Sequence, residues 1–204
     1  PLDDFRVLNA SLFSAAFLAR LGTIIADDEL HSLAMRAAAY VISEQNSDGS
    51  FCYWGSEPGS FIDHFHTGFV LRHLHTIAKV VSSDSISEAF RRGYNFYTKE
   101  LFESGIPKSS PNALYPIDIH SCAEAILCLS TMAPDMGRED LLQSVVTFAT
   151  SRMRHDDGYY VAAMTRSIAG ERQRNIPYMR WGQAWMLLAL ARAESFFASR
   201  ETVA

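Results

Sequence analysis

A repeated helical pattern constrains this 204-residue chain more than any other feature of its sequence. Four short apolar segments recur, and their first residues are separated by 53, 56 and 60 positions. The segments are Ala16–Leu21, Phe69–Leu74, Ala125–Leu129 and Trp185–Leu190. Self-similarity at such a period is typical of proteins that stack one supersecondary unit many times. The chain is therefore predicted to be built from repeated units that each contain one of these segments.

Amphipathic helices are predicted between the apolar segments, over residues 28–46, 84–103 and 138–154. Acidic residues such as Asp27, Asp84 and Glu139 mark their starts, where exposed N–H groups and the helix dipole favour negative charge. Each unit is then a helical hairpin, and the chain has about seven helices. We predict an all-α toroid or barrel of helical hairpins, with a straight solenoid as the alternative. No sheet is expected, and short strands are expected only near Phe51 and Tyr159.

Composition narrows the class of protein and its partners. The net charge of −5 gives no basic footprint for nucleic acid, and no segment looks long and apolar enough to span a membrane. The chain has three cysteines, an odd number that does not suit a disulfide framework. Such cysteine usage favours a reducing compartment, and we expect the protein in the cytoplasm. Residues 1–204 are expected to form one domain. Because the sequence begins at Pro1 and supplies only three and a half hairpins, we expect a homodimer or missing N-terminal hairpins.

Long loops lead from each outer helix back to the next inner helix. They contain Gly49, Gly105 and Gly158 and are rich in aromatic and charged residues. Loops of this length in a compact domain usually carry function, and all three leave the same end of successive hairpins. The candidate site is therefore predicted at this end of the helices.

One loop carries a motif that resembles a known superfamily. Glu44–Phe51 followed by Trp54 resembles the Gln-x-x-Asp-Gly-(Ser/Thr)-(Phe/Trp) motif of α/α toroids of the terpenoid-cyclase and protein-prenyltransferase type. Residues 154–160 keep only the Asp-Gly-aromatic part of the motif. In that superfamily the motif is a structural clasp, so the resemblance implies a fold and not a chemistry.

Three further blocks resemble bacterial toroid proteins associated with polysaccharide synthesis. These blocks are 61–71, 115–125 and 176–185. A related superfamily of α/α barrels contains sugar epimerases, glycan lyases and unsaturated-uronide hydrolases. The resemblance therefore implies a carbohydrate ligand, whereas the resemblance to prenyltransferases implies an isoprenoid.

The same three blocks place polar side chains at the start of each inner helix. His64, His120 and Arg180 each stand five residues before an aligned apolar core, so they are predicted to face one cavity. Asp63 and Asp118 are expected to hold the imidazoles. The plainer interpretation is that these residues cap helices and bind loop backbone. The candidate catalytic residues are His64, His120 and Tyr178, and the candidate substrate-binding residues are Asp63, His66, Tyr115, Asp118, Glu124, Arg180, Trp181, Gln183 and Trp54.

No metal or cofactor is predicted. Asp118, His120 and Cys122 have the residue types of a zinc site, but alternate positions on a helix point to different faces. No nucleotide-binding or common hydrolase motif is present. The preferred hypothesis is a protein that processes or binds an acidic glycan, with chemistry of lyase, hydrolase or epimerase type. In this hypothesis His120 or His64 is the acid or base, and Arg180 pairs with a carboxylate of the glycan. The alternatives are an isoprenoid-binding protein and a non-catalytic interaction scaffold.

Overall fold

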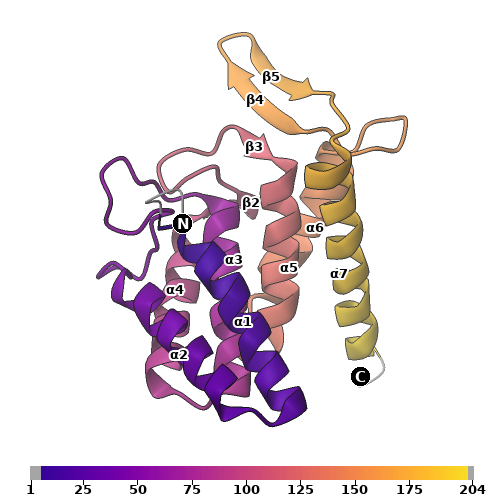
Figure 1. Ribbon diagram of the computed structural model, residues 1–204. Coiled ribbons are helices and arrows are strands. Elements are labelled where there is room, and N and C mark those ends of the chain that lie inside the picture. The colour runs from indigo at the N-terminus through magenta and orange to yellow at the C-terminus, as the bar shows by residue number, and fades with distance from the viewer. Residues whose placement is uncertain (1–5, 202–204) are drawn as a thin grey trace. The chain divides into compact units, whose positions relative to one another are not determined.

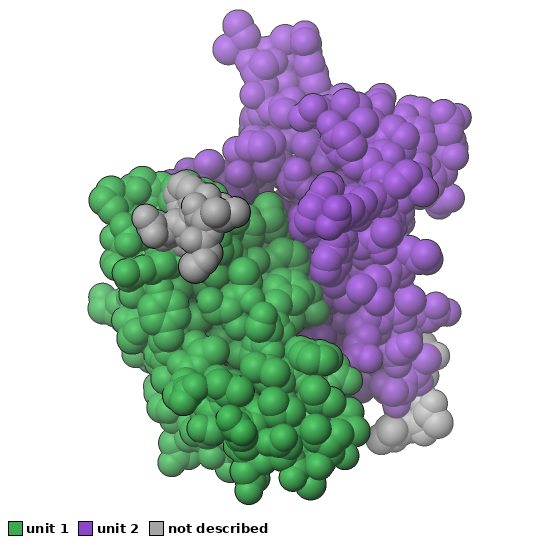
Figure 2. All heavy atoms as spheres, in the orientation of Figure 1, with its two compact units in different colours: residues 1–99 green, residues 100–204 purple. Residues whose placement is uncertain are grey.

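Seven α-helices run through residues 6–201, the part of the chain that the computed structural model describes (Figure 1). Their bounds are α1 (Leu8–Ile25), α2 (Asp28–Ser43), α3 (His64–Val80), α4 (Asp84–Glu100), α5 (Ile119–Met136), α6 (Glu139–Arg152) and α7 (Trp185–Glu201). The predicted number of helices is confirmed. The chain divides into two compact units, residues 1–99 and 100–204, which Figure 2 shows in different colours.

Aspartate caps start three of the helices. Asp27 Oδ1 accepts hydrogen bonds from Glu29 N at 2.9 Å and Leu30 N at 3.2 Å, which satisfies the first free N–H groups of α2. Asp63 and Asp118 cap α3 and α5 in the same way. The start of α6 differs, because its N-cap Arg138 has a left-handed backbone and no side-chain cap.

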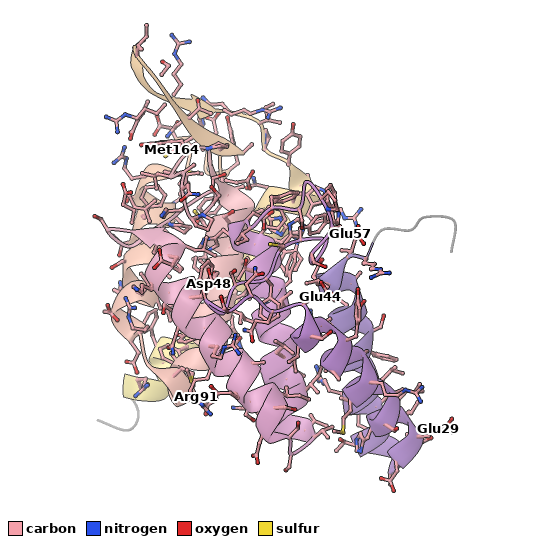
Figure 3. The ribbon with its side chains drawn as sticks, turned by 90° about the vertical axis from the view of Figure 1, so that its left-hand side faces the viewer. Glu29, Glu44, Asp48, Glu57, Arg91 and Met164 are labelled. Carbon is pink, nitrogen blue, oxygen red and sulfur yellow. The ribbon has the colours of Figure 1, made fainter. Side chains whose placement is uncertain are left out.

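The Gln-x-x-Asp-Gly motif forms a clasp in unit 1. Gln45 Nε2 donates to the carbonyl oxygens of Gly49 and Ala89, each at 2.9 Å. Asp48, labelled in Figure 3, accepts from the backbone and the hydroxyl of Ser50. The clasp therefore ties the loop after α2 to α4, which is the structural role that the resemblance implied.

Unit 1 packs α1 against α2 and α3. The buried residues of α4 recur at helical spacing and form one face: Ile86, Ala89, Phe90, Gly93, Tyr94, Phe96 and Tyr97. This pattern is the amphipathic outer helix that the sequence predicted.

Unit 2 is organised around α5, which packs against α6 and α7. Every residue from Ile119 to Ser130 is buried, so α5 is buried on all sides, as predicted for an inner helix. Cys122 and Cys128 are free thiols within it, and burial raises the pKa of Cys122.

The expectation that no sheet forms is wrong. Strands β1 (Phe102–Glu103) and β2 (Ile106–Pro107) pair with each other, and β3 (Ile117–Asp118), β4 (Ala163–Ser167) and β5 (Gly170–Arg174) form an antiparallel sheet in the order β3-β4-β5. The β4–β5 hairpin escaped prediction because it is exposed on both faces beyond Met164 and shows no apolar alternation. Residues 51–54 form no strand, and Tyr160 makes only an isolated bridge to Arg154.

The first and last helices keep exposed apolar side chains. Phe17 on α1 is 64% exposed and Leu187 on α7 is 73% exposed. By length and composition α1 is also long and apolar enough to cross a membrane, contrary to the sequence expectation. The core helix of a soluble protein passes the same test, and α1 packs on α2 and α3.

The homodimer or missing hairpins expected from the sequence stay a prediction.

Substitution of the clasp glycine tests its packing. Gly49 has a φ of +94°, and a Cβ there would lie 2.5 Å from the Arg92 carbonyl oxygen. Gly59 has a φ of +80° with nothing near its Cβ position, so it is a matched control. We expect Gly59→Ala to cost about 1 kcal/mol of unfolding free energy through backbone strain alone. Gly49→Ala should cost a further 1–3 kcal/mol, roughly, in chemical denaturation, and equal losses would contradict the clasp.

A partly buried histidine makes unit 1 sensitive to acid. The His73 ring lies 4.1 Å from the Phe13 ring, and its buried Nε2 has no hydrogen-bond partner among residues 6–201. Burial, and then the charge of Arg72, lower the pKa of His73 to about 4. In the unfolded chain His73 is protonated below about pH 6.5, whereas in the folded chain it stays neutral down to about pH 4. The free energy of unfolding therefore falls as the pH drops from 6.5 towards 4.

Replacement of that histidine should remove part of the acid sensitivity. Between pH 7.5 and pH 5 the His73 contribution to the loss of unfolding free energy is about 2 kcal/mol. His73→Phe should lose less stability than the wild type over this interval in urea titrations at both pH values. Identical losses in both proteins would show that His73 titrates normally.

Candidate functional site

The first turn of α3 contains an aspartate–histidine pair. Asp63 Oδ1 accepts from His66 N at 2.9 Å, and Asp63 Oδ2 lies 2.6 Å from His66 Nδ1. The two side chains are 16% and 19% exposed. Because a carboxylate only accepts hydrogen bonds, the bond assigns a proton to Nδ1 and leaves the lone pair of the neutral imidazole on Nε2. No residue in 6–201 is bonded to Nε2, so the pair has the arrangement of an oriented base.

Aromatic rings surround this pair. The Tyr53 ring lies 4.0 Å from the His66 ring at an interplanar angle of 33°, and Phe61 lies 5.2 Å from Tyr53. Trp54 is 5.7 Å from Phe61 at 73°. Phe61 is exposed, while Tyr53 and Trp54 are partly exposed. The loop before α3 therefore presents ring faces beside a titratable side chain.

His64 has a different environment from the one that the sequence suggested. It is fully buried, and its Nε2 lies 2.7 Å from the Tyr97 hydroxyl on α4. Asp63 does not hold His64; it holds His66. Of the two histidines in the first turn of α3, the partly exposed one is thus His66, two residues further along the helix.

A second cluster forms in unit 2 at the start of α5. The His120 ring lies 5.2 Å from the rings of both Trp181 and Trp185. The Arg180 guanidinium stacks 4.8 Å over the Trp181 ring. Asp118 accepts from His120 N at 2.7 Å, so it caps the helix as Asp63 does. The structure thereby brings together Asp118, His120, Arg180 and Trp181, and it adds Trp185, which the sequence had placed only in the apolar core.

Three other candidates make hydrogen bonds to other residues of unit 2. Gln183 donates to the Tyr160 carbonyl at 2.8 Å and accepts from Tyr160 N at 2.9 Å, which fixes the loop with the degenerate Asp-Gly motif. The Tyr178 hydroxyl lies 3.2 Å from the Arg174 guanidinium. Tyr115 donates to Glu171 on β5, and this bond raises the pKa of Tyr115. Glu124 is fully buried in α5.

The equal spacing of His64, His120 and Arg180 does not give them equal helix positions. His64 is the first residue of α3, His120 is the second of α5, and Arg180 is the second of a π-helical turn, η1 (Met179–Ala184), that leads into α7. His64 belongs to unit 1 and the other two to unit 2. Convergence of the three on one cavity therefore stays a prediction.

Metal ligation has no visible cluster to support it. In the described part of the chain, no three side chains of His, Cys, Asp or Glu are gathered as a metal ion would need. Cys122, the third zinc candidate, is fully buried in α5.

No protein-family model matches this chain, and no curated protein matches it. Several solved structures do resemble it. A polysaccharide lyase matches over 98% of this chain and 64% of its own, with a TM-score of 0.72 and 11% identity.

Two other similar structures are also carbohydrate-active enzymes. One is an unsaturated glucuronyl hydrolase from a Bacillus species, an enzyme responsible for the degradation of glycosaminoglycan. The match covers 95% of this chain and 60% of the hydrolase, with 14% identity and a TM-score of 0.70. The other is the cellobiose 2-epimerase of Bacillus thermoamylovorans, with 98% and 61% covered, 12% identity and a TM-score of 0.71.

The likeness fixes the fold class. This chain spans about three fifths of the length of these structures, and the identities are too low to carry over an activity. The fold predicted from the repeat is confirmed: the chain has the all-α architecture of repeated helical hairpins found in these carbohydrate-active α/α proteins.

Proposed function

We propose that the chain processes an acidic glycan and that the Asp63–His66 pair is its acid–base group. The observation that carries this proposal is the 2.6 Å bond between Asp63 Oδ2 and His66 Nδ1, which presents Nε2 as the free basic atom. The sequence hypothesis of a carbohydrate-processing protein is kept, and the proposed base in unit 1 moves from His64 to His66.

The chemistry that suits this pair is proton transfer at a carbon next to a carboxylate or carbonyl group. His66 Nε2 takes the proton, and the negative charge of Asp63 stabilises the imidazolium that forms. In a lyase the electron pair left on carbon forms a double bond and expels the neighbouring glycosidic oxygen. In an epimerase a proton returns to the opposite face of the same carbon. Both reactions begin with the same base, whereas most glycoside hydrolases use two carboxyl groups.

The ring faces beside the pair suit a sugar. Tyr53, Trp54 and Phe61 offer flat apolar surfaces on which the C–H face of a pyranose can stack. A polar reactive group next to such a platform fits a hydroxylated ligand better than an isoprenoid. The named substrates of similar structures, among them glycosaminoglycan, also favour a glycan.

The cluster in unit 2 supplies groups for substrate binding. Arg180 is exposed and stacks on Trp181, so its guanidinium N–H groups are available to a carboxylate in addition to the ring contact. His120 and Tyr178 remain candidates for acid or base here, and Trp185 joins them as a ring beside His120. The free thiols Cys52, Cys122 and Cys128 support a reducing, cytoplasmic location.

Charge removal from Asp63 tests the proposed base. Asp63→Asn keeps a good N-cap residue, so the melting temperature should change little, but proton transfer should slow by roughly a hundredfold or more. The readouts are deuterium exchange into uronate oligosaccharides by NMR and absorbance of an unsaturated product. His66→Gln should abolish both.

A second capping aspartate provides the control. Asp27 caps α2 through backbone N–H groups alone, so Asp27→Asn should leave the exchange rate unchanged. Normal exchange in Asp63→Asn would refute the role of the pair. Wild-type protein that neither binds nor turns over any acidic glycan would refute the proposed function itself.

Replacement of Arg180 tests carboxylate binding in unit 2. Because Arg180 is exposed, Arg180→Met should leave the melting temperature nearly unchanged while weakening uronate-oligosaccharide binding by roughly 1.5–3 kcal/mol. His120→Ala removes a buried ring between two tryptophans and should lower stability as well. Calorimetric titration and thermal melts on both variants separate the two effects. Lost stability with unchanged affinity in both variants would mean that these residues only hold the fold.

A further inference from the structure

One side of α1 in unit 1 is apolar along most of its length and is not covered. Ala10, Phe13, Phe17, Leu21 and Ile24 recur three or four positions apart, so they form one stripe along the helix. Phe17 is 64% and Ile24 is 77% exposed, and Phe13 is exposed as well. The buried residues of α1 lie around the opposite side, and the helix packs against α2 and α3 (Figure 1). We call this stripe the α1 face.

The last helix, α7 in unit 2, has an uncovered side of the same kind. Four exposed residues lie on it: Leu187, Leu188, Ala191 and Ser195. Leu187 is 73% and Leu188 is 55% exposed. The buried residues of α7 lie on its other side, and the helix packs against α5. We call the exposed side the α7 face.

Neither face is typical of the end of a repeat array. Terminal repeats normally carry a polar outer surface, which keeps arrays from associating. Arg20 is the single ionised residue of α1 within Leu8–Ile25. The inner helix α5 is comparably apolar and is buried on all sides from Ile119 to Ser130. The composition of α1 therefore suits a helix that is covered all round, and its face needs a further neighbour.

A protein helix suits these faces better than a lipid surface. Helices that lie on membranes usually carry several Lys and Arg residues, whereas α1 has only Arg20 and the chain has a net charge of −5. A membrane also gives no reason for the first and the last helix to share this feature. A helix of the same repeat gives such a reason, because α1 already packs on α3 and α7 on α5.

The exposed area indicates how many contacts a stable pair of copies requires. A standard interface buries about 800 Å² on each partner, a little over half of it apolar, and so needs roughly 450 Å² of apolar surface per copy. If a whole large side chain offers about 180 Å², the α1 face supplies roughly 330 Å² and the α7 face roughly 230 Å². One face alone is too small, but the two faces together are sufficient.

We propose that two copies of this chain associate through both faces, with α1 of each copy packed against α7 of the other. The contact adds one more helix to the packing of α7 on α5. Phe17 is the tenth residue of α1, and Leu187 is the ninth of the helical run that begins with η1 at Met179, so the two are level when the helices run parallel. Further along α7, the small side chains of Ala191 and Ser195 leave room for the large ones of the α1 face.

One charged substitution on each face tests the association. Analytical ultracentrifugation compares the wild type with Phe17→Glu, Leu187→Glu and the control Ile168→Glu, which changes a fully exposed apolar residue at the tip of the β4–β5 hairpin. We expect the wild type and the control to be dimers. Each helix variant should have a dissociation constant raised by at least roughly a hundredfold, because a carboxylate would be buried against an apolar face. Circular dichroism checks that the variants are folded.

Cysteine cross-linking tests which faces meet. Phe17→Cys and Leu187→Cys are made separately in a Cys52→Ser background, which leaves only the buried Cys122 and Cys128 as native thiols. Mild oxidation of the mixed variants should give a disulfide-linked dimer, whereas each variant alone should give none. This readout does not depend on the stability of the charged variants.

Several results would overturn the proposal. A wild-type protein that stays monomeric up to its solubility limit would refute it, and flotation of that monomer with phosphatidylcholine vesicles would assign the faces to lipid. Dimers that persist in both Phe17→Glu and Leu187→Glu would place the interface elsewhere. Cross-linking in a single-variant sample would show that like faces meet. Loss of the dimer in Ile168→Glu as well would indicate non-specific association.

Discussion

Burial of the inner helices dictates where polar chemistry can occur in this chain. α5 is buried from its first residue to Ser130, and α3 is buried along most of its inner turns. Polar side chains in the middle of such helices would lose hydration without enough partners, which costs free energy. The first turns are different, because their N–H groups need acceptors in any case. Asp63 and Asp118 meet that need, and the candidate imidazoles follow directly behind them.

The hairpin repeat could be predicted from the sequence because burial imposes a period on it. The spacing of apolar residues in α2 and α4, and the capping aspartate at Asp27, located these helices to within three residues. The β4–β5 hairpin left no comparable signal. Its strands carry polar side chains on both faces, so burial does not impose an alternation of apolar and polar residues on their sequence. Its tip, Ile168–Ala169, also lacks the Asn-Gly or Asp-Gly pair that marks many hairpin turns.

The candidate site could be located in the sequence only to within a turn of helix. Two histidines stand two positions apart at the start of α3, and such positions lie about 200° apart around the axis. Alignment of the apolar cores selected His64, but that side chain turns inward to Tyr97, while His66 keeps partial exposure beside Asp63. A similar uncertainty affects Arg180, because the wider turn of η1 shifts the register of the residues before α7.

The arginines of β5 affect how readily copies of the protein can associate through their strand edges. An edge strand offers unpaired backbone groups on which strands of other chains can assemble, and a two-stranded ribbon that projects from a helical body is especially open to such growth. In β5 three of five residues are ionised, and they follow closely behind the exposed large apolar residue of the tip, Ile168. Mutual repulsion between like-charged hairpins would then keep copies of the protein apart during synthesis and folding, when the helices have not yet covered their apolar faces.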